Sequence, residues 1–177
     1  MKACLLLGSN LGDRKEHLAK ALMCIERDIG TVVLVSQIYE TEPWGFEADT
    51  LFLNQALLID TILPPLHLLE CCHHIETELG RRKAEPARTT GTSEGTETNK
   101  VYASRTIDID ILFYEEVVCE TPELTLPHPR LHQRTFALVP LAEVAPEWRH
   151  PVLGLTAEDL LASLERKNMI FGNDKKM

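Results

Sequence analysis

The chain has 177 residues, of which 44% are hydrophobic and 25% charged, so it is most simply one domain over residues 1–177 with its own core. With 18 Lys and Arg against 27 Asp and Glu, the net charge of −9 argues against general binding to nucleic acids or anionic membranes. No apolar run reaches the roughly 18 residues of a transmembrane helix, and the apolar run near the N-terminus is too short for a signal peptide. The five cysteines form no Cys-x-x-Cys pair, which argues against zinc or redox chemistry. We therefore expect a cytoplasmic protein.

The first half of the chain predicts a strand, a helix and two further strands. Residues 3–7 are apolar and precede a Gly-Ser-Asn-Leu-Gly turn. Apolar residues within 13–28 follow helical spacing, and 31–39 is rich in Val and Ile, as strands are. A loop at 41–49, marked by Pro and Gly, then leads to a strand over 52–62.

The second half predicts a helix over 64–79, a strand over 101–114 and helices over 135–144 and 156–164. Between the first helix and the strand, residues 89–98 contain no apolar side chain. The order strand, helix, strand, strand, helix, strand is that of the split βαβ arrangement. We therefore predict an α+β fold with a ferredoxin-like βαββαβ core and additional C-terminal strands and helices.

The strand before Tyr114 carries the most informative pattern, because residues 106–111 alternate strictly between polar and apolar. Asp108 and Asp110 would stand on its open face, roughly 6–7 Å apart, just after Arg105. Carboxylates this close repel each other unless a cation lies between them. Mg²⁺ commonly binds one or two carboxylates together with substrate phosphates. A solvated polar face is the alternative interpretation, but Asp is depleted in strands.

Other side chains are weaker candidates for ligand contacts. Phe52 and Asn54 share a strand face, where a ring could stack on a heterocycle and an amide could pair with its edge; a core residue and a plain polar residue are the alternative. His73 and His128 suit single phosphate or hydroxyl contacts better than a zinc site. The turn at 8–12 lacks the phosphate-loop and dinucleotide fingerprints and is interpreted as structural.

Together these motifs resemble one enzyme family over roughly residues 3–165. In order they are Gly8-Ser-Asn-Leu-Gly12, Tyr39-x-Thr41-x-Pro43-x-Gly45, Phe52-Leu-Asn54, Ile75-Glu76 before Gly80-Arg81, Arg105-Thr-Ile-Asp-Ile-Asp-Ile-Leu112, and Leu126-Pro-His128 before Arg134-x-Phe136. The set is similar to the 6-hydroxymethyl-7,8-dihydropterin pyrophosphokinases of folate biosynthesis. That family transfers pyrophosphate from ATP to the hydroxymethyl group of the pterin and releases AMP.

The resemblance implies a role for each matching residue. Asp108 and Asp110 would hold two Mg²⁺ ions, and the catalytic residues would be Asp110, Arg81 and Arg105. The pterin would contact Thr41, Pro43, Trp44, Phe52, Asn54 and Phe136. The ATP contacts would be His73, Glu76, Arg81, Lys83, Arg105, Ile111, His128 and Arg134. By the same resemblance the protein would be a monomer whose partners are these two small molecules.

The chain departs from the family pattern between the second helix and the Asp strand. Residues 89–98 are an insertion, Tyr102 stands where the family often has Trp, and Lys83 where it often has Arg. From its net positive charge and polar centre, we predict that 81–105 is a mobile lid that orders when ATP and pterin bind. Two alternative functions stay open: another Mg²⁺-dependent phosphoryl or nucleotidyl transferase, and a ferredoxin-like ligand-binding or RNA-binding module, of which the acidic charge disfavours RNA.

Overall fold

The computed structural model describes residues 1–44, 50–80 and 105–172. Its elements are β1 (Lys2–Ser9), α1 (Arg14–Asp28), β2 (Gly30–Val35), β3 (Tyr39–Thr41), β4 (Phe52–Thr61), α2 (Pro65–Glu78), β5 (Asp108–Tyr114), β6 (Cys119–Glu120), β7 (Thr125–Leu126), a 3-10 turn at Leu131–Gln133, α3 (Thr135–Val144) and α4 (Ala157–Gly172). Within the three described ranges, no helix has the length and hydropathy needed to span a bilayer.

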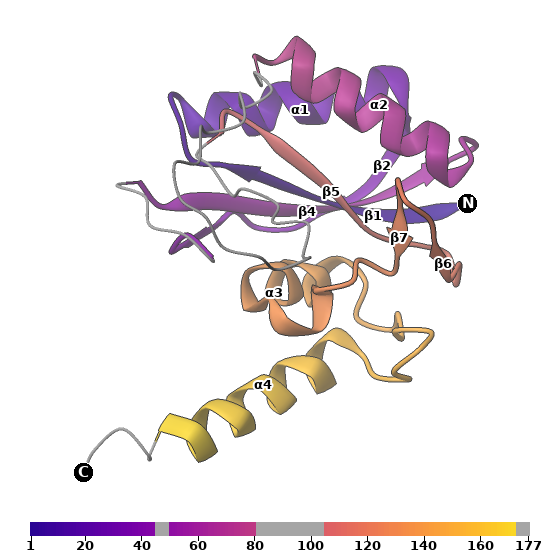
Figure 1. The fold of residues 1–177 in the computed structure, drawn as a ribbon. Helices are drawn as coiled ribbons and strands as arrows, with labels where there is room; N and C mark the ends of the chain where they lie inside the picture. Colours follow the sequence, from indigo (N-terminus) through magenta and orange to yellow (C-terminus); the bar gives the residue numbers. More distant parts are fainter. Residues whose placement is uncertain (45–49, 81–104, 173–177) are drawn as a thin grey trace, which may run out of the picture.

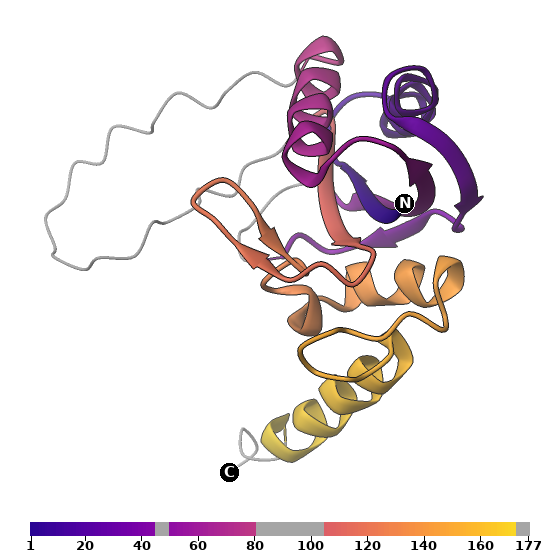
Figure 2. The same cartoon turned by 90° about the vertical axis from the view of Figure 1, so that its right-hand side faces the viewer.

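An antiparallel sheet of five strands organises the molecule. The order is β2-β4-β1-β5, and the short β3 pairs with the first residues of β4. Helices α1 and α2 lie side by side on one face, while α3 lies under the other face with α4 outside it (Figure 1). The hairpin β6–β7 projects from the sheet beside β5 (Figure 2). A mixed architecture of sheet and helices, the coarse part of the fold prediction, is thus confirmed.

The alternation of side chains along the strands creates two separate cores. The core under α1 and α2 includes Leu5, Leu7, Leu18, Ile25, Leu57, Leu68, Ile75, Ile109 and Ile111. The core under α3 includes Cys4, Leu6, Ala56, Leu58, Leu112, Phe113, Leu138 and Leu141. Because the central strands are apolar on both faces, neither face can be left to solvent, and helices on both sides are required.

The strand predicted over 31–39 is divided in the structure. β2 ends at Val35 and β3 begins at Tyr39, so the prediction of one continuous strand is wrong. Ser36 explains the break, because its hydroxyl accepts a hydrogen bond from the backbone N–H of Ala56 (2.9 Å). The side chain thus takes a position in the ladder that a backbone carbonyl would otherwise fill.

The Asp strand also starts later than predicted. Of the expected range 101–114, the described residues before Asp108 are not in the strand. The N–H of Arg105 donates instead to Oδ1 of Asn10 (2.8 Å), and its carbonyl accepts from the N–H of Asn10 (3.2 Å). A side chain from the turn after β1 therefore replaces the sheet partner at this point.

A β-bulge divides β5 into two parts. Leu5 is paired with Ile111 and Cys4 with Phe113, so Leu112 is the extra residue. After the bulge Phe113 faces the α3 side, where its ring stacks on Trp148 with centroids 4.4 Å apart and planes 8° from parallel. The far end of β5 is thereby fixed to the segment that connects α3 to α4.

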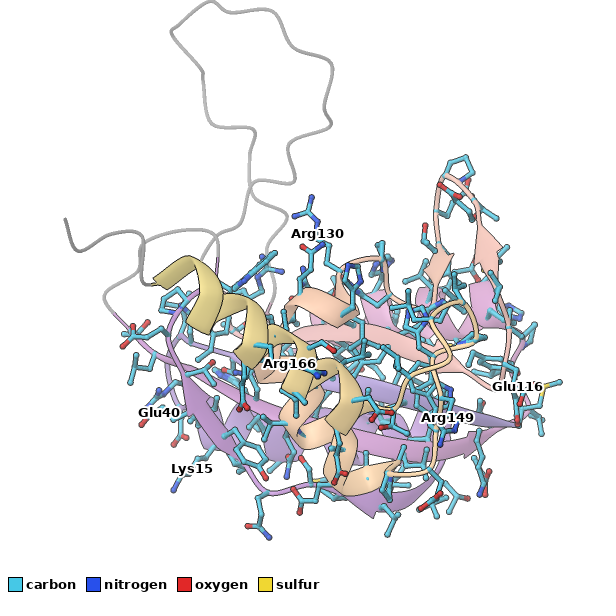
Figure 3. All side chains as sticks on the ribbon, turned by 90° about the horizontal axis from the view of Figure 1, so that it is seen from below. Lys15, Glu40, Glu116, Arg130, Arg149 and Arg166 are labelled. Carbon is cyan, nitrogen blue, oxygen red and sulfur yellow. The ribbon has the colours of Figure 1, made fainter. Side chains whose placement is uncertain are left out.

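Helix α4 extends the molecule on the side away from the sheet. Thr156 caps its first turn, since the Thr156 hydroxyl accepts from the N–H of Asp159 (3.2 Å). In return, Oδ2 of Asp159 accepts from the N–H (3.0 Å) and the hydroxyl (2.9 Å) of Thr156. These two hydrogen bonds hold the pKa of Asp159 below its ordinary value. Figure 3 shows Arg149 near the start of this helix and Arg166 on its outer side.

Candidate active site

A cavity of about 550 Å³ opens on the α3 side of the sheet, where β1, β4 and β5 meet α2 and the hairpin β6–β7. Among the residues predicted for the site, it is lined by Thr41, Trp44, Phe52, Asn54, His73, Glu76, Arg105, Asp108, Asp110, Ile111, His128, Arg134 and Phe136. Pro43 does not line it. Arg81, Lys83, Tyr102 and the predicted lid, apart from Arg105, lie outside the described residues. Residues far apart in the chain are therefore brought to one cavity.

Apart from the single residues Glu42, Leu69, Ile109 and Pro129, sequence reasoning missed two parts of the cavity wall. The first is the hairpin segment 121–125, which carries no recognisable motif. The second is the floor, formed by Leu6 and Gly8 of β1. The floor could have been predicted, because Leu6 and Gly8 are two residues apart on the predicted first strand and so face the same side of the sheet.

The floor of the cavity is a row across three strands. Gly8 lies between Asn54 on β4 and Asp108 on β5, and each is its direct partner in the ladder. A Cβ built on Gly8 would lie 3.6 Å from Oδ1 of Asn54 and 3.8 Å from both Cβ of Asp108 and Cδ1 of Phe52. The absent side chain therefore leaves room between the amide and the carboxylate.

Each carboxylate of the Asp strand is paired with an arginine. Nη1 of Arg105 lies 2.8 Å from Oδ1 of Asp108, and Nη1 of Arg134 lies 3.3 Å from Oδ2 of Asp110. The same nitrogen of Arg134 is 3.3 Å from Nε2 of His128. Opposite charges at these distances offset the repulsion between the two carboxylates. Arg130, by contrast, extends outward from the molecule (Figure 3).

The other end of the cavity is aromatic. The rings of Trp44 and Phe136 lie 6.4 Å apart at an angle of 55°. The guanidinium carbon of Arg134 is 5.0 Å from the centre of the Trp44 ring and 5.6 Å from that of Phe136. Asn54 completes this end, since its Nδ2 donates to the hydroxyl of Thr41 (2.8 Å). Arg134 therefore joins the aromatic end to the acidic strand by cation–π contact on one side and charge on the other.

Behind the acidic strand, α2 supports its backbone. Glu76 is only 3% exposed, and its Oε1 accepts a hydrogen bond from the N–H of Ile109 (2.8 Å), the residue between the two aspartates. Burial raises the pKa of the neighbouring Cys72, and the charges of Glu76 and Asp110 act in the same direction. The thiol therefore stays protonated and is no candidate nucleophile.

The arrangement has a donor set that fits Mg²⁺. Among the described residues, no group of three or more His, Cys, Asp and Glu could hold a metal ion. Asp108 and Asp110 both line the cavity and offer hard oxygen ligands on one face of β5. Two carboxylates are sufficient where substrate phosphates supply the remaining ligands, as Mg²⁺ sites commonly have it.

Comparison with known proteins defines the class of this site. A family model described as 7,8-dihydro-6-hydroxymethylpterin-pyrophosphokinase matches residues 4–146. Proteins named 2-amino-4-hydroxy-6-hydroxymethyldihydropteridine pyrophosphokinase are also similar. The protein from Porphyromonas gingivalis is 45% identical over 150 residues, covering 83% of this chain and 92% of that protein. The protein from Bacillus subtilis is 42% identical over 144 residues, covering 80% of this chain and 77% of that protein.

These matches make the protein a transferase of the pyrophosphokinase type. The chain belongs to the 7,8-dihydro-6-hydroxymethylpterin-pyrophosphokinase family, which confirms the resemblance carried by its motifs. Its place is thus in folate biosynthesis.

Solved structures share the fold at low sequence identity. One described as HPPK-DHPS in complex with substrates has a TM-score of 0.68 and 14% identity, covering 94% of this chain and 44% of that one. Plasmodium falciparum HPPK-DHPS with pteroate gives 0.71 and 17%, covering 97% of this chain and 44% of that one. The chain therefore spans less than half the length of these structures, and the likeness shows the fold alone.

Proposed function

We propose that this protein transfers the terminal pyrophosphate of ATP to 6-hydroxymethyl-7,8-dihydropterin. The hydroxymethyl oxygen attacks the β-phosphorus, a new O–P bond forms, and the bond from the β-phosphorus to the bridging oxygen of the α-phosphate breaks. The hydroxyl proton leaves, and AMP departs with the bridging oxygen. One observation carries the proposal: a single cavity places an aromatic and amide end beside two carboxylates paired with arginines.

The aromatic end suits a flat, amide-bearing heterocycle. Phe52 and Phe136 would hold the pterin between their rings, and Asn54 would pair with its edge, since an amide offers both a donor and an acceptor. Backbone groups of Thr41, Pro43 and Trp44 would complete this subsite.

The acidic end suits a metal-bound triphosphate. Asp108 and Asp110 would hold a pair of Mg²⁺ ions, which supply charge neutralisation of the phosphates when bound. Arg105 is close enough to that carboxylate pair to donate to a phosphate oxygen, as a planar guanidinium does well. The proposed ATP contacts are His73, Glu76, Arg81, Lys83, Ile111, His128 and Arg134. Asp110 is proposed as the acceptor of the hydroxyl proton.

Several finer points are part of the same proposal. The strand order and antiparallel pairing support assignment of a ferredoxin-like core. Five thiols without a disulfide support a reducing, cytoplasmic environment. We extend the proposal to one domain over residues 1–177 that acts as a monomer.

The test is an assay of nucleotide products from ATP and Mg²⁺, with and without 6-hydroxymethyl-7,8-dihydropterin. AMP release that depends on the pterin is the expected result. Release of ADP or of a nucleotidylated product would favour a different Mg²⁺-dependent transferase. Absence of turnover, with ligand binding retained, would favour a binding module.

A further inference from the structure

Arg105 is held by a residue that does not line the cavity. The strand β5 begins three residues later, at Asp108, so the sheet does not fix Arg105. Instead Asn10 bonds both backbone groups of Arg105: its Oδ1 accepts from the N–H (2.8 Å) and its N–H donates to the carbonyl (3.2 Å). This two-point clamp continues the ladder beyond the end of the strand. The side chain of Arg105 then reaches Asp108.

Asn10 is also tied to the segment that leads into β4. Its Nδ2 donates to the hydroxyl of Thr50 (3.3 Å), and that hydroxyl donates to the carbonyl of Asn10 (2.7 Å). Thr50 stands two residues before Phe52, which lines the aromatic end. At 1% exposure, Asn10 has its amide oxygen bonded to the segment before β5 and its amide nitrogen bonded to the segment before β4.

Two neighbouring residues make parallel links. The hydroxyl of Ser9 donates to the carbonyl of Thr106 (2.5 Å), and Nη1 of Arg14 donates to the carbonyl of Leu51 (2.9 Å). The connection from the end of β1 to the start of α1, residues 9–14, is thus bonded both to the segment before β5 and to the segment before β4. A turn needed only to start a helix would not require bonds to both.

We infer that Asn10 is a positioning residue of the transfer reaction: through the chain Thr50–Asn10–Arg105 it sets the guanidinium of Arg105 against Asp108. The inference rests on the proposed function, because Arg105 acts there on the phosphates. Asn suits the task because an amide presents a donor and an acceptor at once. Asn10 is expected to act through Arg105, so its effect on turnover should depend on the presence of that guanidinium.

A double-mutant cycle tests this dependence, with pterin-dependent AMP release as the readout. Asn10→Ala is expected to lower kcat/KM by about 30-fold, because a small misplacement of a catalytic group costs up to about 100-fold. In an Arg105→Ala background the same substitution is expected to cost less than about twofold, since no guanidinium remains to be positioned. A purely structural residue would cost the same factor in both backgrounds.

Thr50→Val tests the outer link and serves if Asn10→Ala does not fold. It removes the hydroxyl with little change in shape, and we expect kcat/KM to fall about fourfold, again only when Arg105 is present. The matched control is Thr61→Val at the other end of β4, whose hydroxyl donates to the carbonyl of Ile29 at the same 2.7 Å. The control is expected to leave kcat/KM within twofold, because the two hydrogen bonds of its hydroxyl, with Ile29 and Leu63, involve no residue that lines the cavity.

The outcomes separate this inference from the proposed function. Wild-type protein that releases no pterin-dependent AMP would overturn both. Wild-type turnover with equal losses in the two backgrounds, or with Thr50→Val no different from Thr61→Val, would overturn the role of Asn10 alone. Loss of activity confined to the background with Arg105 supports it.

Discussion

Side chains at both ends of β5 point to the α3 side of the sheet, but their surroundings are opposite. At the first end Asp108 and Asp110 have side chains that are 24% and 30% exposed, beside arginines and an open cavity. At the other end Leu112 and Phe113 are at most 3% exposed and are covered by α3 and Trp148. Within six residues, one strand thus carries both the charged side chains of the site and the buried side chains that anchor the strand to α3.

The difference shows how a small domain can hold two carboxylates side by side. Two like charges on one strand face cost stability by mutual repulsion, a cost that the paired arginines Arg105 and Arg134 reduce. The stacked and buried residues at the other end contribute the hydrophobic stabilisation that offsets this cost. Substitutions at the first end should therefore change activity, and those at the second end should change stability.

The largest expected effect is on activity at the acidic end. Asp108→Asn and Asp110→Asn keep the shape but remove the charge, and each should lower kcat/KM for AMP release by roughly 1000-fold or more, as loss of a metal ligand or electrostatic group does. Urea denaturation should change little. Asp60→Asn, on the exposed end of β4, is the matched control and should be neutral. Near-normal turnover of Asp110→Asn would rule out its role as proton acceptor.

At the buried end, Phe113→Ala should change stability instead. Removing a ring that stacks on Trp148 at 4.4 Å leaves a cavity, and the free energy of unfolding should fall by about 3–4 kcal/mol. Turnover per folded molecule should stay within about threefold. Urea unfolding followed by Trp fluorescence measures the first quantity, with the exposed Val118→Ala as a neutral control. A large loss of turnover at full stability would contradict the division of labour along the strand.

Much of the acidic end could be predicted from the sequence, because a period of two reports directly which side chains share a strand face. The alternation in 106–111 is sufficient by itself to place Asp108 and Asp110 together. The same argument places Phe52 and Asn54 on one face of their strand. The assignment of ATP and pterin roles, however, depends on the ordered motifs and not on periodicity.

The remainder depends on contacts that no local pattern encodes. The pairing of Arg134 with Asp110 joins residues 24 apart, and the stack of Trp148 on Phe113 joins residues 35 apart. The late start of β5 has the same origin, since Asn10 replaces a sheet partner for Arg105 across 95 residues. Only tertiary packing brings such partners together, so propensity and spacing could not predict them.

Substitutions of two glycines should have effects of intermediate size, one on substrate binding and the other on stability. Gly8→Ala adds a methyl group at ordinary contact distances of 3.6–3.8 Å in the cavity floor, so the chain should fold normally while KM for the pterin rises about tenfold. Gly30→Ala places a Cβ 2.2 Å from the carbonyl oxygen of Asp60 and should cost about 2–3 kcal/mol of stability with turnover intact. Steady-state kinetics and urea denaturation of both variants distinguish the two effects. The reverse pattern would mean that Gly8 is not part of the floor.

The smallest expected effect concerns the pH dependence of the buried end. His150 is 7% exposed, lies 5.8 Å from the Trp148 ring, and its Nδ1 accepts from the N–H of Val152 (3.3 Å). Burial, and to a lesser extent His132, lowers the pKa of His150 in the folded state. A histidine whose folded pKa is below its unfolded value near 6.5 favours the neutral form.

Its contribution to stability is therefore complete above about pH 6.5 and is lost as the pH falls from there through the folded pKa. His150→Asn keeps an acceptor near the position of Nδ1 but does not titrate. The difference in unfolding free energy between wild type and this variant should shrink between pH 8 and pH 5, in urea titrations at each pH. Other titrating groups cancel in that difference. Turnover at pH 8 should be equal in the two proteins, because His150 lies beside Trp148 at the anchored end of β5. Unequal turnover at pH 8 would mean that the two ends of β5 are not independent.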